Sequence, residues 1–321
     1  MSFREQDARG EATAGRPSGS RWLITAVVIA LLAAMAGYLF TRREELASFQ
    51  RLSTTVLLIA LLFQFLSQLF WNGAILLPLQ ACMRLGYWEL FMVRTGGFLV
   101  GYMVPVAGNI AVRLTYLRRR GLTYSDFTWA TLLSNVLALF AGAVLAVFAV
   151  GMLWVIAGTP PAPVLGLTAG VLALGVTGLT VFQFLPALAG HPQLQRWPWL
   201  SSVSGFKASH RTMRWVLAFS FVRHCCNFLT FGLLYQSVSR APSEFLTGGL
   251  VYAITSPIRI VAITPGNLGV NEWVVAMVGK VLSFDLTTGL IVALVFRGMS
   301  VASQGLGVLL GGAWLALWGE P

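Results

Sequence analysis

Charged side chains inside long hydrophobic stretches are the first candidates for chemistry in this 321-residue chain. Glu272 is the only acid placed in this way, and Arg94, Arg223, Arg259 and Arg297 are the bases. A charge at the centre of a membrane costs about 2.5–3.5 kcal/mol on insertion scales, which makes each of these residues a functional candidate. We expect Arg297 or Arg259 to pair with Glu272, and the surplus arginines to attract an anion such as a lipid phosphate.

Two other roles are open for these arginines. Any one of them can belong to an ion pair that only fixes the packing of helices. Arg94 and Arg259 can also lie near a membrane interface, with the guanidinium group reaching the lipid headgroups. Either role would remove that arginine from a binding site.

Three short patterns recur in the same order in the two halves of the chain. They are Thr-Gly-Gly, then Gly-Asn-[Ile/Leu]-[Ala/Gly]-Val, then Asp-[Phe/Leu]-Thr. They lie at 95–97, 108–112 and 126–128, and again at 247–249, 266–270 and 285–287. The preserved order indicates an internal duplication. In membrane proteins, glycine- and proline-containing breaks at corresponding points of two repeats indicate a binding site.

The residues of the two breaks suit an anion. Asn109 and Asn267 are of a type that caps helix N-termini, where free N–H groups bind phosphate or carboxylate. Gly266 and Gly269 let the backbone approach a ligand closely. The predicted substrate-binding residues are Asn109, Arg113, Arg223, Arg259, Gly266, Asn267, Gly269, Glu272 and Arg297. The alternative is that each break only ends a helix and turns the chain.

The composition indicates that these residues lie in a membrane-spanning protein. Hydrophobic residues make up 57% of the chain and charged residues only 10%, against about 25% charged in soluble domains. Several apolar runs reach the roughly 20 residues that a helix needs to cross a bilayer. We therefore predict an all-α polytopic membrane protein.

Other classes of site are not indicated. The net charge of +11 is explained by basic loops beside anionic headgroups, and no basic stretch interleaved with aromatics predicts nucleic-acid binding. The three cysteines and three histidines lack the spacing of a metal site or a disulfide framework. No metal and no cofactor is predicted.

About six full spans and two broken, re-entrant helical hairpins are expected. The spans are 22–40, 54–79, 127–156, 164–188, 215–238 and 287–318. The broken hairpins cover about 90–117 and 245–281. Residues 1–20 are predicted to be a disordered cytoplasmic tail, and 21–321 a transmembrane domain with repeat halves at about 52–156 and 215–318.

The distribution of basic residues predicts the orientation. With the N-terminus in the cytoplasm, most Lys and Arg residues fall in cytoplasmic loops, as the positive-inside rule requires. Three spans then separate the two breaks, so the two halves enter the membrane from opposite faces. The duplication is therefore predicted to be an inverted repeat, with the breaks meeting near the middle of the membrane.

Three parts of the sequence also carry a resemblance to a known family. They are Pro-x-x-Gly-Asn through Arg at 105–113 with the basic run at 117–121, Pro-Gly-Asn-Leu-Gly-Val-x-Glu at 265–272, and Arg297 in the last span. Over about residues 50–318 the chain resembles the lysylphosphatidylglycerol synthase transmembrane-region family, whose domain is flippase-like. The resemblance implies a multi-pass protein that moves or handles a polar lipid.

The expected function is that of a lipid transporter in the inner membrane of a bacterial or archaeal cell. Its partner would be an anionic phospholipid, a modified lipid or a polyprenyl-phosphate carrier. The alternative is a non-transporting membrane subunit that scaffolds a lipid-modifying glycosyl- or aminoacyl-transferase. No Ser-elbow, HExxH or GxxxxGK[ST] motif occurs, and the protein is not expected to be an enzyme.

Overall fold

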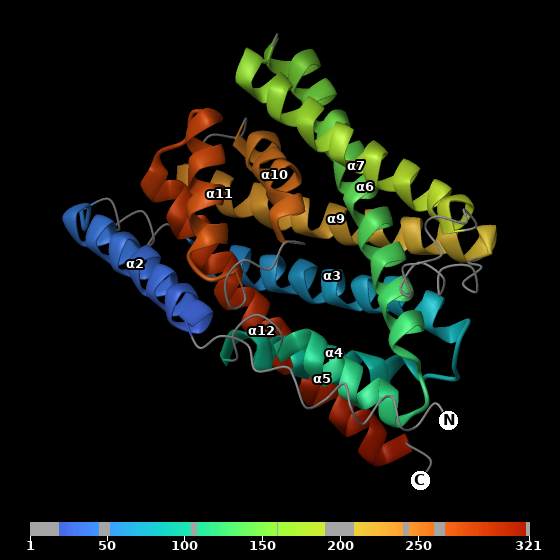
Figure 1. Cartoon of the computed structure of the whole chain (residues 1–321). Helices are drawn as coiled ribbons and strands as arrows, with labels where there is room; N and C mark the ends of the chain where they lie inside the picture. The colour runs from blue at the N-terminus through green and yellow to red at the C-terminus, as the bar shows by residue number, and fades with distance from the viewer. Residues whose placement is uncertain are drawn as a thin grey trace.

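A computed structural model describes residues 19–44, 52–103, 108–158, 160–189, 209–239, 244–259 and 267–318, and these residues form helices joined by turns (Figure 1). The long helices are α2 (Gly19–Thr41), α3 (Thr54–Gln80), α6 (Tyr124–Ala157), α7 (Ala162–Ala189), α9 (His210–Ser239) and α12 (Leu286–Trp318). The short ones are α4 (Tyr87–Met103), α5 (Gly108–Arg119), α10 (Glu244–Thr255), the 3-10 helix η4 (Ser256–Arg259) and α11 (Val270–Val281). The prediction of an all-α protein is confirmed.

Five helices of the described residues are long and apolar enough to cross a membrane, namely α3, α6, α7, α9 and α12. They coincide with five of the six predicted spans, and α2 occupies the place of the remaining one. The chain is thus a multi-pass membrane protein. The predicted N-terminal tail falls on residues 1–18, which lie outside the described residues, and on Gly19 and Ser20, where α2 begins.

Side-chain caps fix where two of the spanning helices begin. The Ser53 hydroxyl accepts the N–H of Val56 at 3.2 Å at the start of α3. The Thr123 hydroxyl accepts the N–H of Asp126 at 3.1 Å at the start of α6. Such caps satisfy N–H groups that have no partner within the helix. The first copy of the Asp-[Phe/Leu]-Thr pattern therefore begins a spanning helix.

Each predicted broken hairpin contains short helices on both sides of residues that lie outside the described part of the chain. In the first, α4 and α5 flank residues 104–107, which lie outside the described residues. In the second, α10 and η4 precede α11, and residues 260–266 lie outside the described residues. Among the described residues, no helix of spanning length lies in either segment, and most of each predicted break falls on residues 104–107 and 260–266.

The order of elements in the first half recurs in the second. The series α3–α4–α5–α6 matches α9–α10–α11–α12, and α7 lies between the two series. The short helix of each half packs on the last long helix of the other half, because α4 lies against α12 and α10 against α6. The two halves are therefore interleaved, and a polar site between them would draw residues from both.

Helices α3 and α9 form the centre of this arrangement and run in opposite directions (Figure 1). Gly73 lies beside Phe219, Ser67 accepts a hydrogen bond from Asn227 at 2.7 Å, and Thr230 donates to the Ala60 carbonyl at 3.5 Å. Residue numbers fall on one helix as they rise on the other, so these two equivalent helices are antiparallel. This is the relation that an inverted repeat requires.

Glycines let the short helix α10 approach α9 closely. A Cβ atom at Gly248 would lie 2.5 Å from the Cβ of Tyr235, and one at Gly249 would lie 2.4 Å from the ring of Phe228. Small residues at such positions are a common means of helix packing in membranes, where no hydrophobic force drives helices together. The Thr-Gly-Gly pattern of the second half is thus explained by packing.

We predict that Gly248→Ala destabilises the protein by about 1–3 kcal/mol, the usual cost of overpacking. The atom it would meet, the Cβ of Tyr235, is fixed to the backbone of α9 and can yield only if the helices separate. Gly170→Ala on α7 is the matched control, because no atom lies within 4 Å of its added Cβ. Thermal unfolding in detergent measures both, and equal stability of the two variants would contradict the packing role.

Candidate functional site

The buried carboxylate of the second break forms an ion pair with the last long helix. Glu272 lies in the first turn of α11 and is 1% exposed, and its Oε1 accepts a hydrogen bond from Nε of Arg297 on α12. Its Oε2 accepts the N–H of Gly269 at 2.7 Å. Of the two arginines predicted as its partner, Arg297 pairs with it, and the side chain of Arg259 lies outside the described residues. Both carboxylate oxygens are therefore engaged within the protein.

The backbone at the end of the second break turns around the same arginine. The Asn267 carbonyl accepts Nη2 of Arg297 at 3.1 Å, and the Asn267 side chain donates to the Ile258 carbonyl at 3.3 Å. Gly269 has φ of +81°, and a Cβ atom there would lie 2.8 Å from the Cβ of Leu31 on α2. A side chain is thus excluded at Gly269 both by the backbone conformation and by α2.

The predicted capping roles of the two asparagines are wrong. Gly269 is the N-cap residue of α11, and its N–H is taken by Glu272. Asn267 lies two residues upstream in the left-handed region, with φ of +53°. Asn109 is the second residue of α5, which begins at Gly108. The start of α11 therefore already holds a carboxylate of the protein, so it is not an open anion site.

Asn109 and Arg113 pack against α4 through two glycines one helical turn apart. A Cβ at Gly97 would lie 3.2 Å from the Asn109 carbonyl oxygen and 3.6 Å from Cγ of Arg113. A Cβ at Gly101 would lie 3.2 Å from Cβ of Asn109. Oδ1 of Asn109 and Nε of Arg113 are buried and have no hydrogen-bond partner among the described residues. One acceptor and one donor therefore remain unused beside the first break.

Arg297 lies between the two breaks. It donates to Asn267 at the second break, and its guanidinium carbon lies 5.6 Å from the ring centre of Tyr102, in the last turn of α4 before the first break. Tyr102 follows Gly101, which contacts Asn109. The ion pair is thus contacted by Tyr102, which precedes the first break, and by Asn267, which follows residues 260–266 of the second.

Arg94 is fully buried. The alternative in which its guanidinium group reaches the lipid headgroups at a membrane interface is therefore wrong. Its two terminal nitrogens donate to the side chain and the carbonyl of Gln68 at 3.0 and 2.8 Å, and Nε donates to Asn72 at 3.4 Å. The rings of Phe91 and Phe98 lie 5.7 and 5.6 Å from the guanidinium carbon. Neutral amides and aromatic faces replace its water shell.

Two further arginines lie near Arg94. Arg113 on α5 packs against Gly97, one turn along α4 from Arg94. Arg223 on α9 lies beside Trp71, the neighbour of Asn72 on α3. The guanidinium carbon of Arg113 lies 5.6 Å from the ring centre of Phe127, and that of Arg223 lies 3.8 Å from the ring centre of Trp71. None of the three has a carboxylate partner within the described part of the chain. We name Arg94, Arg113 and Arg223 the arginine cluster.

The predicted residues therefore fall into two groups. Asn267, Gly269, Glu272 and Arg297 surround the neutral ion pair, and Asn109 and Arg113 lie beside the first break. Arg223 joins Arg113 in the arginine cluster. Gly266 and the side chain of Arg259 lie outside the described residues.

Sequence reasoning missed the amides that hold Arg94. Gln64, Gln68 and Asn72 follow one another at four-residue spacing within the hydrophobic helix α3, which puts them on one face. Besides the contacts of Gln68 and Asn72 with Arg94, Gln64 donates to Ser300 on α12 at 2.7 Å. Three amide side chains on one face of an apolar span are the sequence pattern from which these partners of Arg94 could have been predicted.

We predict that Glu272→Gln and Arg297→Gln each destabilise the protein by about 3–5 kcal/mol, because each leaves one buried charge unpaired. The double variant should lose clearly less than the sum, since it removes both charges together. Thermal unfolding of the four proteins in detergent gives the coupling. Losses that simply add would show that the two side chains do not act as a pair.

Comparisons with known proteins agree with this architecture. The family described as "Lysylphosphatidylglycerol synthase TM region" matches residues 21–307, which include every described helix except the last part of α12 and the first residues of α2. A search of the curated proteins gives no match. Since the family match covers most of the chain, this membrane protein belongs to the lysylphosphatidylglycerol synthase transmembrane-region family.

Proposed function

We propose that this protein transports a lipid across the inner membrane of a bacterial or archaeal cell, in the manner of a flippase, and that it binds an anionic headgroup at the arginine cluster. One observation carries the proposal. Arg94 and Arg223 contact the same stretch of α3, 68–72, and Arg113 packs one turn along α4 from Arg94. None of the three has a carboxylate partner among the described residues. Membership of a family named for a lipid synthase supports a lipid as the ligand.

The electrostatics of the cluster favour a phosphate. Charges in a low-dielectric interior are costly unless an opposite charge or good hydrogen bonds compensate them. Amides compensate Arg94, but Nε of Arg113 lacks a partner within the described residues. Guanidinium groups match the geometry of phosphate oxygens and bind them through two hydrogen bonds at once. A lipid phosphate would supply both the charge and the missing acceptor.

The unused acceptor beside the cluster suggests a second feature of the ligand. Oδ1 of Asn109 is buried without a hydrogen-bond partner among the described residues. It lies 3.4 Å from the Cβ position of Gly97, the same glycine that Arg113 approaches. An amide oxygen accepts a hydrogen bond from a hydroxyl or an ammonium group. A phosphate that carries such a group would satisfy Arg113 and Asn109 together.

The Glu272–Arg297 pair takes a different role in this proposal. Its charges cancel, and its contacts extend to Asn267 on one side and Tyr102 on the other. It therefore aligns the two breaks instead of binding the phosphate directly. Glu272 acts by orienting Arg297, and Arg297 contributes positive potential to the headgroup only when the pair opens.

The proposal keeps the orientation inferred from the basic residues, with the N-terminus in the cytoplasm. It assigns transport and not catalysis to the chain. A separate transferase that modifies the lipid fits as a partner, since the modified lipid would be the transported species. The lipid itself can be an anionic phospholipid, a modified lipid or a polyprenyl-phosphate carrier, which share the phosphate.

The test is translocation of a fluorescent anionic phospholipid in proteoliposomes. Arg113→Gln and Arg223→Gln should each lower the rate about tenfold or more, the effect of losing one charged hydrogen bond to the headgroup. Arg118→Gln is the matched control, because Arg118 lies on the same helix as Arg113 but is exposed.

Three results would contradict the proposal. Unchanged rates in both cluster variants would remove the cluster from the transport path. An equal loss in Arg118→Gln would indicate a general effect of charge. A wild-type protein that translocates no lipid but copurifies with a transferase would favour the scaffolding alternative.

A further inference from the structure

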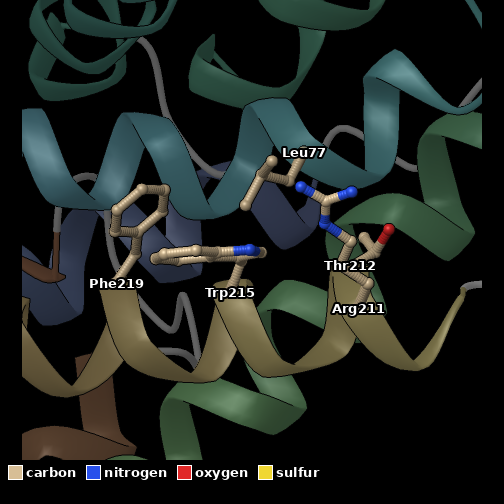
Figure 2. A pocket seen from close by; sticks show the side chains of 5 residues that line it. All are labelled: Leu77, Arg211, Thr212, Trp215 and Phe219. Atoms are coloured by element: carbon tan, nitrogen blue, oxygen red, sulfur yellow. The ribbon is translucent and has the colours of Figure 1, made fainter.

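A groove of about 400 Å³ lies between α3 and α9, apart from the arginine cluster (Figure 2). Leu77 of α3 and Arg211, Thr212, Trp215 and Phe219 of α9 line it. In Figure 2 the indole ring of Trp215 lies between the ring of Phe219 on one side and the guanidinium group of Arg211 on the other. The groove therefore changes from apolar to charged along its length.

This change of polarity follows the axis of α9. Arg211, Trp215 and Phe219 are four residues apart, so they project from one side of the helix over about 12 Å. Arg211 is in the first turn, at the end of a membrane-spanning helix, and Phe219 is two turns further into the span. A phospholipid has the same order of parts, with its phosphate at the membrane edge and its acyl chain below.

The walls of the groove are fixed by aromatic packing. The ring of Phe219 lies 3.0 Å from the Cβ position of Gly73 and 6.0 Å from the ring of Phe70, both on α3. The rings of Trp215 and Phe219 lie 5.9 Å apart. Trp215 is nevertheless 51% exposed, so its other face remains open to a neighbouring molecule. Tryptophan is enriched at this depth because its ring contacts acyl chains while its N–H meets polar groups.

The charge at the mouth of the groove selects an anion. Arg211 is exposed in the first turn of α9, and this turn contains no acid. The N–H of Thr212 is already capped by the Ser209 hydroxyl at 3.0 Å, so an anion here depends on the side chain of Arg211. The partial positive charge of the helix N-terminus adds to that of Arg211.

We propose that this groove binds one phospholipid with an anionic headgroup, with its phosphate at Arg211 and an acyl chain along Trp215 and Phe219. The site is distinct from the arginine cluster and does not depend on transport. One turn beyond Phe219, Arg223 of the cluster lies over Trp71, so Phe219 separates the groove from the buried charges. A lipid in the groove would be held close to the cluster before or after its headgroup enters.

Quenching of tryptophan fluorescence by brominated lipids tests this proposal in the full-length protein. The protein has 11 tryptophans. The contribution of Trp215 to the fluorescence is the difference between the wild-type protein and the Trp215→Phe variant. Brominated phosphatidylglycerol should quench this contribution with an apparent affinity about tenfold higher than brominated phosphatidylcholine. Arg211→Gln should abolish the preference, and Arg214→Gln, which changes an exposed arginine outside the groove, should retain it.

Equal quenching of Trp215 by the two lipids would overturn the proposal. An equal loss of preference in Arg214→Gln and Arg211→Gln would overturn it too, because it would show attraction to the whole basic surface. The outcome is independent of the proposed transport function. Arg113→Gln should leave the preference at Trp215 intact, even where it stops translocation.

Discussion

The arrangement of this protein depends on the cost of keeping arginine in a membrane interior. Burial removes the water that stabilises a guanidinium group, and each group must regain that stabilisation from its neighbours. The protein does so in two ways. Arg297 is neutralised by Glu272, whereas Arg94 is surrounded by Gln68, Asn72 and two aromatic rings. Pairing with Glu272 leaves no net charge at Arg297. The neutral side chains around Arg94 leave its positive charge in the domain.

The Glu272–Arg297 pair and the buried Arg94 lie in different parts of one bundle, in which helices of the two halves alternate. Helices α3 and α9 pack antiparallel at its centre, and one short helix of each half packs against the last long helix of the other half. Arg297 on α12 consequently contacts Tyr102 of the first half and Asn267 of the second, and Arg223 on α9 and Arg94 on α4 contact the same stretch of α3. A ligand held by the cluster would therefore contact both halves, which is the condition for coupling its binding to a relative movement of the halves.

The sequence was sufficient for the helical membrane fold and for an ion pair of Glu272 with one of two arginines, because these follow from apolar runs and from the rarity of buried acids. It left the choice between Arg297 and Arg259 open. It was insufficient for the local role of the asparagines. Glu272 lies three residues after Gly269, and its carboxylate takes the N–H group that Asn267 was expected to cap. It was also insufficient for the burial of Arg94, since that depends on which side chains of α3 the fold brings to α4. Residues that make contact between different helices are not separated by any fixed number of residues, so a sequence pattern does not reveal them.

We propose that the arginine cluster binds a lipid phosphate, and a structure of the protein determined in nanodiscs of anionic phospholipid would test this binding. We expect a phosphate whose oxygens lie about 2.7–2.9 Å from the guanidinium nitrogens of Arg113 and Arg223. A structure in which both guanidinium groups contact only protein or water, with every ordered phosphate at the membrane surface, would contradict it.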